Sequence, residues 1–330
     1  MEKNESLENN NEDSEATLSI EDVISQFDGI PLPPAIKKNL WKSCARLITS
    51  AVDIPVAFLE AKADQIRKVS NAKGLIISEA AKAAAKEFAS DAKLIERSVD
   101  YFGARLVREQ KNRESIMNKT VFDLETNSNS SSHSAMETSE IDDDWLEAFS
   151  RIAETKSNDD IQTFLAKILA GEIRKPGTFN PQTIQTLSVL DQATAKSFKC
   201  FCDISFELPN VEDYFTCVIT QFTGNPNLNS LKEFGLSYAV LTNLQDVGLI
   251  KHDLVSYNEF PYQVFIAPHF VGDQKFSFQL QNDSKTEKVK IQIIRLTNAG
   301  LELRRVIPRS FNATFNEKYT EWVKKMFHIS

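Results

Sequence analysis

The sequence predicts a mainly α-helical protein with a C-terminal α+β module. Three features lead to this fold class. Residues 31–124 consist largely of good helix formers and contain glycine only at Gly74 and Gly103. Residues 141–205 contain repeated helix-capping residues, each followed by an apolar stripe. From residue 206 onward, β-branched and aromatic residues alternate with polar ones in short runs.

These features divide the chain into five predicted segments. We expect a disordered acidic tail over 1–30, a long helical stalk or helical hairpin over 31–124, a linker over 125–140, a compact helical core over 141–205 and a winged-helix-like α+β domain over 206–330. The length of 330 residues leaves room for two domains and a linker, and an apolar content of 42% is enough for a core.

The overall composition argues against several classes of protein. A formal net charge of −8 does not suit a chain that coats nucleic acid. The acidic, polar start does not resemble a signal peptide, and no apolar run reaches the roughly 18 residues that span a bilayer. Cys44, Cys200, Cys202 and Cys217 do not form a secreted disulfide framework, and no cysteines or histidines have metal-ligand spacing. We therefore expect a cytoplasmic protein without metal or cofactor.

The N-terminal tail is predicted to be disordered because residues 1–30 hold nine acids against Lys3 alone, with few large apolar groups. Within the tail, Leu18–Phe27 has the pattern of a short amphipathic helix. The proline-rich run Ile30–Pro34 follows as a stiff, extended connector.

Residues 34–52 are predicted to form a basic amphipathic helix. Its apolar face consists of Ile36, Leu40, Trp41, Cys44, Leu47 and Ile48. Such a helix could lie on an anionic membrane surface, or it could pack on the next helix with its bases in solvent. We favour packing, because Pro55 marks a turn after which a long partner helix begins.

That partner helix, residues 55–124, carries an apolar repeat of eleven residues. The positions with this spacing are Ile66, Ile77, Phe88 and Val99. Eleven residues make three turns of about 3.67 residues each, so the stripe stays on one side of a nearly straight helix. The stripe must be covered, either because the helix folds back at Gly74 or Gly103 or because a second subunit covers it. We predict a homo-oligomer that assembles through this stripe.

The helical core shows the most consistent local pattern in the chain. Trp145, Phe149 and Ile152 recur at helical spacing after the acidic run Asp142–Asp144, whose carboxylates complement a helix dipole. Polar residues at 157–160 supply cap oxygens for a second helix. The second helix should end at Pro176-Gly177, and a third should begin at Asn180-Pro181. Asp191 should cap a further helix.

The same region carries a family resemblance. The strings WLEAF from Trp145, AKILAGEIRKPGTF from Ala166 and T-x-x-x-L-x-x-L-D from Thr183 closely resemble the core motif of a bacterial family catalogued as domain of unknown function 2806. The resemblance implies an architecture and no activity. Its residues Trp145, Glu172, Pro176, Gly177 and Phe179 are candidates for an interaction site, although a structural role as core anchors and turn residues is the favoured interpretation.

A fainter resemblance lies at the start of the stalk. The string LPPAIKKNLWKSCARLITSAVDIP from Leu32, followed by a charged helix, is similar in layout to the N-terminal half of Abi-alpha-type phage-exclusion proteins. This resemblance implies a role in phage defence.

The C-terminal pattern resembles a winged-helix domain. A strand in YFTCVITQF from Tyr214 precedes a helical segment over 229–247, a short strand over 249–252, a hairpin of 276–280 with 289–296, and a helix capped by Thr297. A terminal helix over 316–327 should bury Tyr319, Trp322 and Met326 on one stripe.

Winged helices often bind DNA, but the expected recognition helix over 237–247 contains no lysine or arginine. Phosphate neutralisation and base reading both depend on such residues. Residues 229–330 hold 13 bases against 10 acids, and Arg304, Arg305 and Arg309 are expected on solvated faces of a helix end. A winged helix that docks a protein is therefore the favoured interpretation, and a DNA-binding regulator is the alternative.

A catalytic role is not indicated by any motif. Hydrolases need a nucleophile beside a base, and kinases need a glycine-rich phosphate loop. Ten glycines and four histidines show neither pattern. We therefore predict a non-catalytic interaction or scaffold protein that self-associates through its stalk and docks a protein partner.

Overall fold

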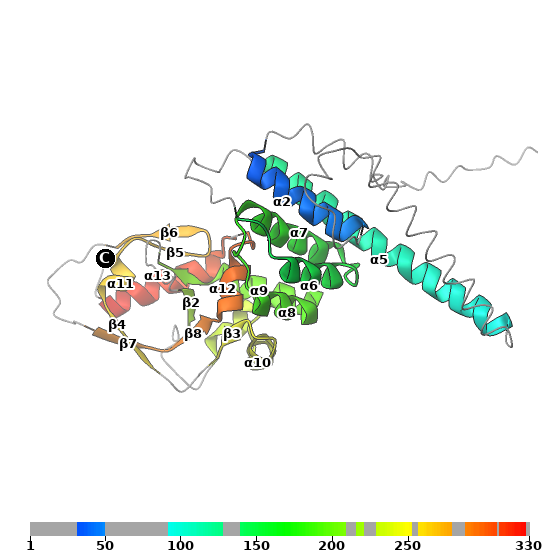
Figure 1. The fold of residues 1–330 in the computed structure, drawn as a ribbon. Helices are drawn as coiled ribbons and strands as arrows, with labels where there is room; N and C mark the ends of the chain where they lie inside the picture. The colour runs from blue at the N-terminus through cyan, green and yellow to red at the C-terminus, as the bar shows by residue number, and fades with distance from the viewer. Residues whose placement is uncertain are drawn as a thin grey trace, which may run out of the picture.

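A computed structural model describes residues 32–49, 92–127, 139–208, 216–220, 229–252, 257–278, 288–308 and 310–327. The predicted acidic tail, most of the predicted linker and the stripe residues Ile66, Ile77 and Phe88 lie outside these ranges. The described part is mostly helical, with antiparallel strands in its C-terminal region (Figure 1).

The first helix, α2, covers Pro34–Cys44 and continues as a π-helical turn, η1, over Ala45–Thr49. Its apolar face is buried in the protein core, through Ile36, Leu40, Cys44, Leu47 and Ile48. The bases are held by acids of the core, as Lys42 is by Asp143 at 2.8 Å. The structure therefore shows the predicted packing of the apolar face, which lies against other helices. Contact of 34–52 with a membrane surface stays a prediction.

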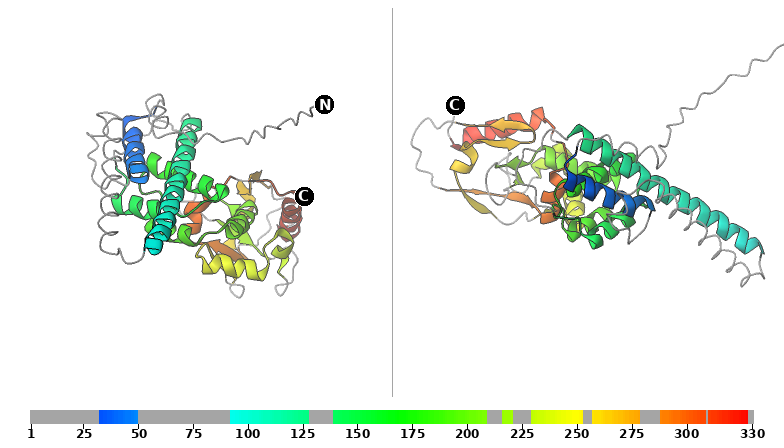
Figure 2. Two further views of the ribbon diagram at one scale, coloured as in Figure 1. Left: turned by 90° about the vertical axis from the view of Figure 1, so that its right-hand side faces the viewer. Right: turned by 45° about the horizontal axis from the view of Figure 1, so that its top comes forward.

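The long helix α5 covers Ala92–Thr126 without interruption. It passes straight through Gly103, so the stalk does not fold back there; Gly74 lies outside the described residues. Its C-terminal half packs against α7 (Asp159–Arg174), while its N-terminal half extends away from the rest of the described protein (Figures 1 and 2). At about 1.5 Å per residue, the 35 residues span roughly 52 Å.

The core contains α6 (Asp143–Ala153), α7, α8 (Pro181–Val189) and α9 (Gln192–Asp203). Each begins with the kind of cap that the sequence predicts, a side-chain oxygen that accepts a hydrogen bond from the backbone N–H three residues later. The capping residues are Asp142, Asn158, Asn180 and Asp191. The helix starts in this region therefore follow from local sequence.

Six strands form an antiparallel sheet in the order β3-β8-β2-β1-β5-β6. They are β1 (Phe206–Glu207), β2 (Thr216–Ile219), β3 (Ile250–Lys251), β5 (His269–Val271), β6 (Gln274–Phe276) and β8 (Ile293–Leu296). A separate ribbon pairs β4 (Asn258–Pro261) with β7 (Lys288–Ile291). The predicted hairpin of 276–280 with 289–296 is wrong: β6 pairs with β5 across the tight turn at Gly272, and β7 pairs with β4.

Helical segments flank the sheet. They are η3 (Ser230–Phe234), α10 (Tyr238–Asp246), α11 (Gln263–Ile266), α12 (Asn298–Arg304) and α13 (Ala313–Phe327). The predicted single segment over 229–247 is broken at Gly235, whose φ of 82° ends η3 in the left-handed region that glycine favours. Among the described helices, we find none whose length and hydropathy would carry it across a bilayer.

Two predicted side-chain positions are wrong. Met326 of α13 is 40% exposed, and the buried stripe instead continues from Tyr319 and Trp322 to Val323 and Phe327. Arg304 is buried rather than solvated, and its guanidinium lies 3.5 Å from the carboxylate of Glu207 in β1. The sheet packs against the end of α12 and encloses this arginine, which no local pattern could have shown.

Candidate functional site

The family motif lies at the turn over 175–180, which joins α7 to α8. We call it the Glu172 turn, because the carboxylate of Glu172 in the last part of α7 holds it. Oε1 accepts the N–H of Gly177 at 2.6 Å, and Oε2 accepts the N–H of Phe179 at 3.0 Å. Gly177 has a φ of 81°, a conformation that L side chains rarely adopt. Burial raises the pKa of Glu172, although these backbone hydrogen bonds oppose the increase.

Aromatic packing fixes the same turn from α6. The indole N–H of Trp145 donates to the carbonyl oxygen of Phe179 at 2.7 Å, and its ring stacks on Phe149 with centroids 5.2 Å apart. The ring of Phe179 fits against Gly171, where an added Cβ would lie 3.0 Å from Cε2. Trp145, Glu172 and Phe179 are all buried, whereas Pro176 is half-buried and Gly177 is exposed.

A second glutamate ties this turn to the C-terminal region. Glu302 of α12 accepts hydrogen bonds from the backbone and side chain of Asn180, at 2.9 and 2.6 Å, and from the hydroxyl of Thr183 at 2.5 Å. Glu302 lies in the predicted helix that Thr297 caps, but no local pattern indicated that it reaches the core motif. The five motif candidates therefore form one structural unit, and their buried polar atoms are occupied by partners within the chain.

The stripe candidates are only partly described. Ile66, Ile77 and Phe88 lie outside the described residues, and Val99 lies in α5. The exposed part of α5 that follows carries four large apolar side chains, Tyr101, Phe102, Leu106 and Val107. Leu106 lies seven residues after Val99, on nearly the same side of α5, in a part of the helix that the other described residues leave exposed.

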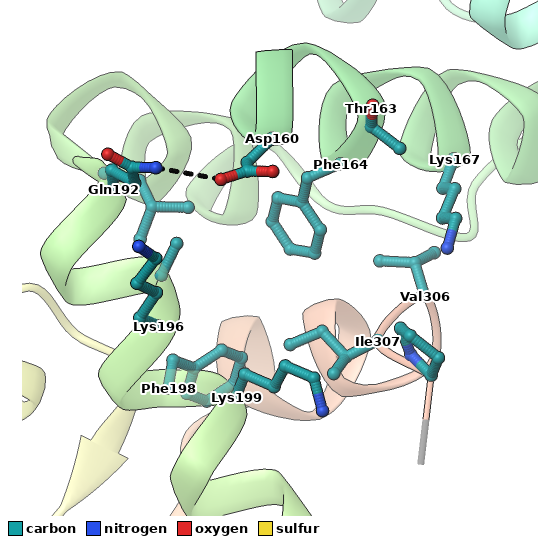
Figure 3. Close-up of a pocket in the computed structure, with 13 residues that line it drawn as sticks. Asp160, Thr163, Phe164, Lys167, Gln192, Lys196, Phe198, Lys199, Val306 and Ile307 are labelled. Atoms are coloured by element: carbon teal, nitrogen blue, oxygen red, sulfur yellow. Dashed lines mark hydrogen bonds between the residues drawn. The ribbon is translucent and has the colours of Figure 1, made fainter. Parts of the chain in front are cut away.

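A pocket that sequence reasoning missed lies between α7, α9 and the segment 306–308 that follows α12 (Figure 3). Its volume is about 390 Å³. Its apolar lining comes from Phe164, Leu190, Phe198, Val306 and Ile307. In Figure 3, Phe164 points from α7 into the pocket toward Ile307. The pocket assembles residues from three distant parts of the chain, so no local pattern could have predicted it.

Three lysines stand around this apolar lining. Lys199 is held by the carboxylate of Asp203, at 2.8 and 2.9 Å, and by the hydroxyl of Ser310 at 2.6 Å. Lys167 is half-buried and Lys196 is exposed, and neither forms a hydrogen bond or an ion pair with the described residues. Asp160, the acid at the opposite rim, accepts a hydrogen bond from Gln192 at 2.9 Å. The pocket therefore suits a ligand with an apolar group and a neighbouring negative charge.

Among the described cysteines, Cys44, Cys202 and Cys217 are buried, whereas Cys200 is exposed. Burial raises the pKa of Cys44 and Cys202 to about 12, which keeps both thiols protonated at neutral pH. Across the described ranges, no group of three or more His, Cys, Asp and Glu side chains is placed to hold a metal ion.

Comparison with known proteins gives one match. Neither a curated protein nor a solved structure is similar enough to match the chain. The family described as "Protein of unknown function (DUF2806)" matches residues 96–321, which include most of α5, the Glu172 turn, the lysine-rimmed pocket and most of α13. This match covers well over half of the chain and extends far beyond the motif at 145–201 that first suggested it. The chain belongs to this DUF2806 family.

Proposed function

We propose that the protein is a non-catalytic scaffold that self-associates through the projecting half of α5. The observation that carries this proposal is a single apolar face with two different surroundings. Leu106 and Met117 are eleven residues apart and lie on the same side of the helix. Met117 is fully buried against the core, whereas Leu106 is 47% exposed.

The neighbouring position repeats this relationship. Phe102 is 56% exposed and lies eleven and twenty-two residues before Arg113 and Leu124 on the same face; Leu124 is fully buried. A face that the core covers at one end and solvent reaches at the other is the kind of surface that a second helix covers in an oligomer. A second copy carries the same face, so an antiparallel or parallel pair of α5 helices would bury both.

Light scattering of the full-length chain tests this proposal. Leu106→Glu should shift the protein toward the monomer, because it places a charge in the proposed interface. Val107→Glu is the matched control: Val107 is 70% exposed but lies about 100° around the helix from Leu106. The proposal is wrong if the wild-type chain is a monomer at a concentration of about 50 μM, where an association with a micromolar Kd would be visible. It is also wrong if the Leu106→Glu and Val107→Glu variants dissociate the oligomer equally.

We further propose that the C-terminal region is winged-helix-like and docks a protein. Support comes from the order of η3, α10 and β3, with β3 paired to β8 and the β4–β7 ribbon beside the sheet. The exposed residues of α10 are Tyr238, Ala239, Asn243, Gln245 and Asp246, so this helix presents an aromatic and polar surface with one acid and no cation. The layout resemblance to phage-exclusion proteins suggests phage defence as the setting for such a scaffold.

The alternative is a DNA-binding regulator. The β4–β7 ribbon supplies exposed cations for this role, Lys288 and Lys290, which lie 3.9 and 3.4 Å from Glu259. Titration of the full chain against random duplexes at low and physiological salt separates the two functions. Binding that is lost uniformly with salt would argue against the regulator, whereas enrichment of one sequence that Lys288→Glu and Lys290→Glu abolish would establish it.

A further inference from the structure

The pocket between α7, α9 and residues 306–308 has two properties that favour the same kind of ligand. Phe164, Val306 and Ile307 are only half-buried, so apolar surface remains in contact with solvent inside a concave site. Lys167 and Lys196 stand beside that surface without a partner among the described residues. Burial of an apolar side chain would stabilise a ligand here, and a neighbouring carboxylate would pair with the lysines.

A segment with this chemistry occurs in the chain itself, ahead of α2. Ile20, Val23, Ile24 and Phe27 follow the spacing i, i+3, i+4 and i+7 of one helix face. Ser19 and Asp22 have the spacing of a helix start, with a cap residue followed three positions later by an acid. The segment therefore offers an apolar face that a short helix would present to a pocket.

Charge complementarity favours this segment as the occupant. Glu21, Asp22 and Asp28 flank its apolar positions, and Lys3 is the only base among the first 30 residues against nine acids. A helix with this composition would bring carboxylates to the rim where Lys167 and Lys196 lie. The attraction would add to burial of the apolar face and would orient the segment on the pocket.

Chain connectivity ties the segment to a helix that packs on α7. Helix α2 begins directly after the tail and is fixed to α7, the helix that forms one wall of the pocket, by a hydrogen bond from Asn39 to the carbonyl oxygen of Ile173. The eight residues from Ile24 to Leu32 reach up to roughly 26 Å when extended. A tether of this length gives the segment a high effective concentration at the surface around α7.

We propose that the acidic amphipathic segment Leu18–Phe27 of this chain docks in the lysine-rimmed pocket. Its apolar face covers Phe164, Val306 and Ile307, and its carboxylates pair with Lys167 and Lys196. This inference is independent of the self-association through α5, because the pocket and the projecting half of α5 share no residue.

A labelled peptide of residues 16–29 tests the proposal by fluorescence anisotropy, with the full-length chain as receptor. The receptor carries Ile24→Asp and Phe27→Asp, so that its own tail no longer competes. We expect this receptor to bind the peptide, and wild type to bind it more weakly because its tail occupies the site. Reversal of both pocket lysines, Lys167→Glu and Lys196→Glu, should weaken binding by about tenfold or more.

Lys232→Glu is the matched control, because Lys232 is an exposed lysine of η3 outside the pocket. It should leave the affinity for the peptide unchanged. All these receptor variants change exposed or half-buried lysines or tail residues, and thermal melts verify that each remains folded. Equal binding of the peptide by the Lys167→Glu, Lys196→Glu receptor and the control would overturn the proposal. Absence of binding to the tail-substituted receptor would overturn it as well.

Discussion

The hydroxyl of Tyr319 in α13 and Nε2 of His269 in β5 share a hydrogen bond of 2.6 Å in the interior of the C-terminal region. On the other side of the ring, Nδ1 lies 2.7 Å from the carbonyl oxygen of Ala267, which can only accept a hydrogen bond. Nδ1 therefore carries the proton and Nε2 accepts from the tyrosine. His269 is fully buried among Phe206, Phe276 and Tyr319, and this pair joins the last helix to the sheet.

This geometry predicts a loss of stability in mild acid. Burial lowers the pKa of His269 to about 4, from about 6.5 for an exposed histidine. Because the unfolded chain takes up the proton first, the free energy of unfolding should fall as pH drops from about 6.5 to about 4, by up to roughly 3 kcal/mol. Urea melts at several pH values measure this decrease in the free energy of unfolding. His269→Gln should flatten the dependence, whereas His252→Gln should not; a wild-type profile that stays flat would contradict the prediction.

Trp145→Ala should lower the free energy of unfolding by about 3–5 kcal/mol. The change leaves a cavity beside Phe149 and removes the donor to the carbonyl oxygen of Phe179. Trp145→Phe keeps a stacked ring and loses chiefly the hydrogen bond, so its cost should be clearly smaller. Chemical denaturation of both variants decides, and equal losses would mean that ring packing contributes little.

Glu172→Ala should destabilise the chain by about 2–4 kcal/mol, because it leaves the N–H groups of Gly177 and Phe179 without their acceptor. Glu172→Gln retains one side-chain acceptor and should cost about half as much. Glu154→Ala is a comparison at a glutamate of the same core that accepts from Arg113 instead. Denaturant melts in which Glu172→Gln is less stable than Glu172→Ala would contradict this role of the carboxylate.

Two helical glycines should respond to alanine in opposite directions. At Gly300 of α12, an added Cβ would lie 2.1 Å from the carbonyl oxygen of Leu249, so Gly300→Ala must displace backbone and should cost at least about 2–3 kcal/mol. At Gly103 of α5 no atom of the described residues would lie within 4 Å of an added Cβ, so Gly103→Ala should stabilise the helix by about 0.5–1 kcal/mol. Thermal melts of the two variants test both signs.

The core helices could be predicted closely because their signals are local. Asp142, Asn158, Asn180 and Asp191 each cap a helix through a hydrogen bond that spans three residues, so neighbouring sequence suffices to place it. The motif residues around Glu172 were singled out by the family resemblance, whereas the hydrogen bonds from Gly177 and Phe179 to its carboxylate became visible only in the structure.

Strand pairing and the pocket depended on long-range contacts. Each of the runs 276–280 and 289–296 looks like a strand, but alternation of polar and apolar residues does not name the partner strand. The sheet pairs β6 with β5 and β7 with β4 instead. Likewise, exposure of Met326 and burial of Phe327 depended on which side of α13 meets the sheet.

The sequence by itself determined where the four core helices begin, where the turns between them fall and to which family the motif points, because the caps and turns depend on hydrogen bonds within a few residues. Only the tertiary structure decided that Glu302 reaches Asn180 across 122 positions, that Arg304 is buried beside Glu207, and that Phe164, Lys196 and Ile307 share one pocket. These relationships join residues far apart in the chain, and their energy comes from burial that exists only once the core has packed.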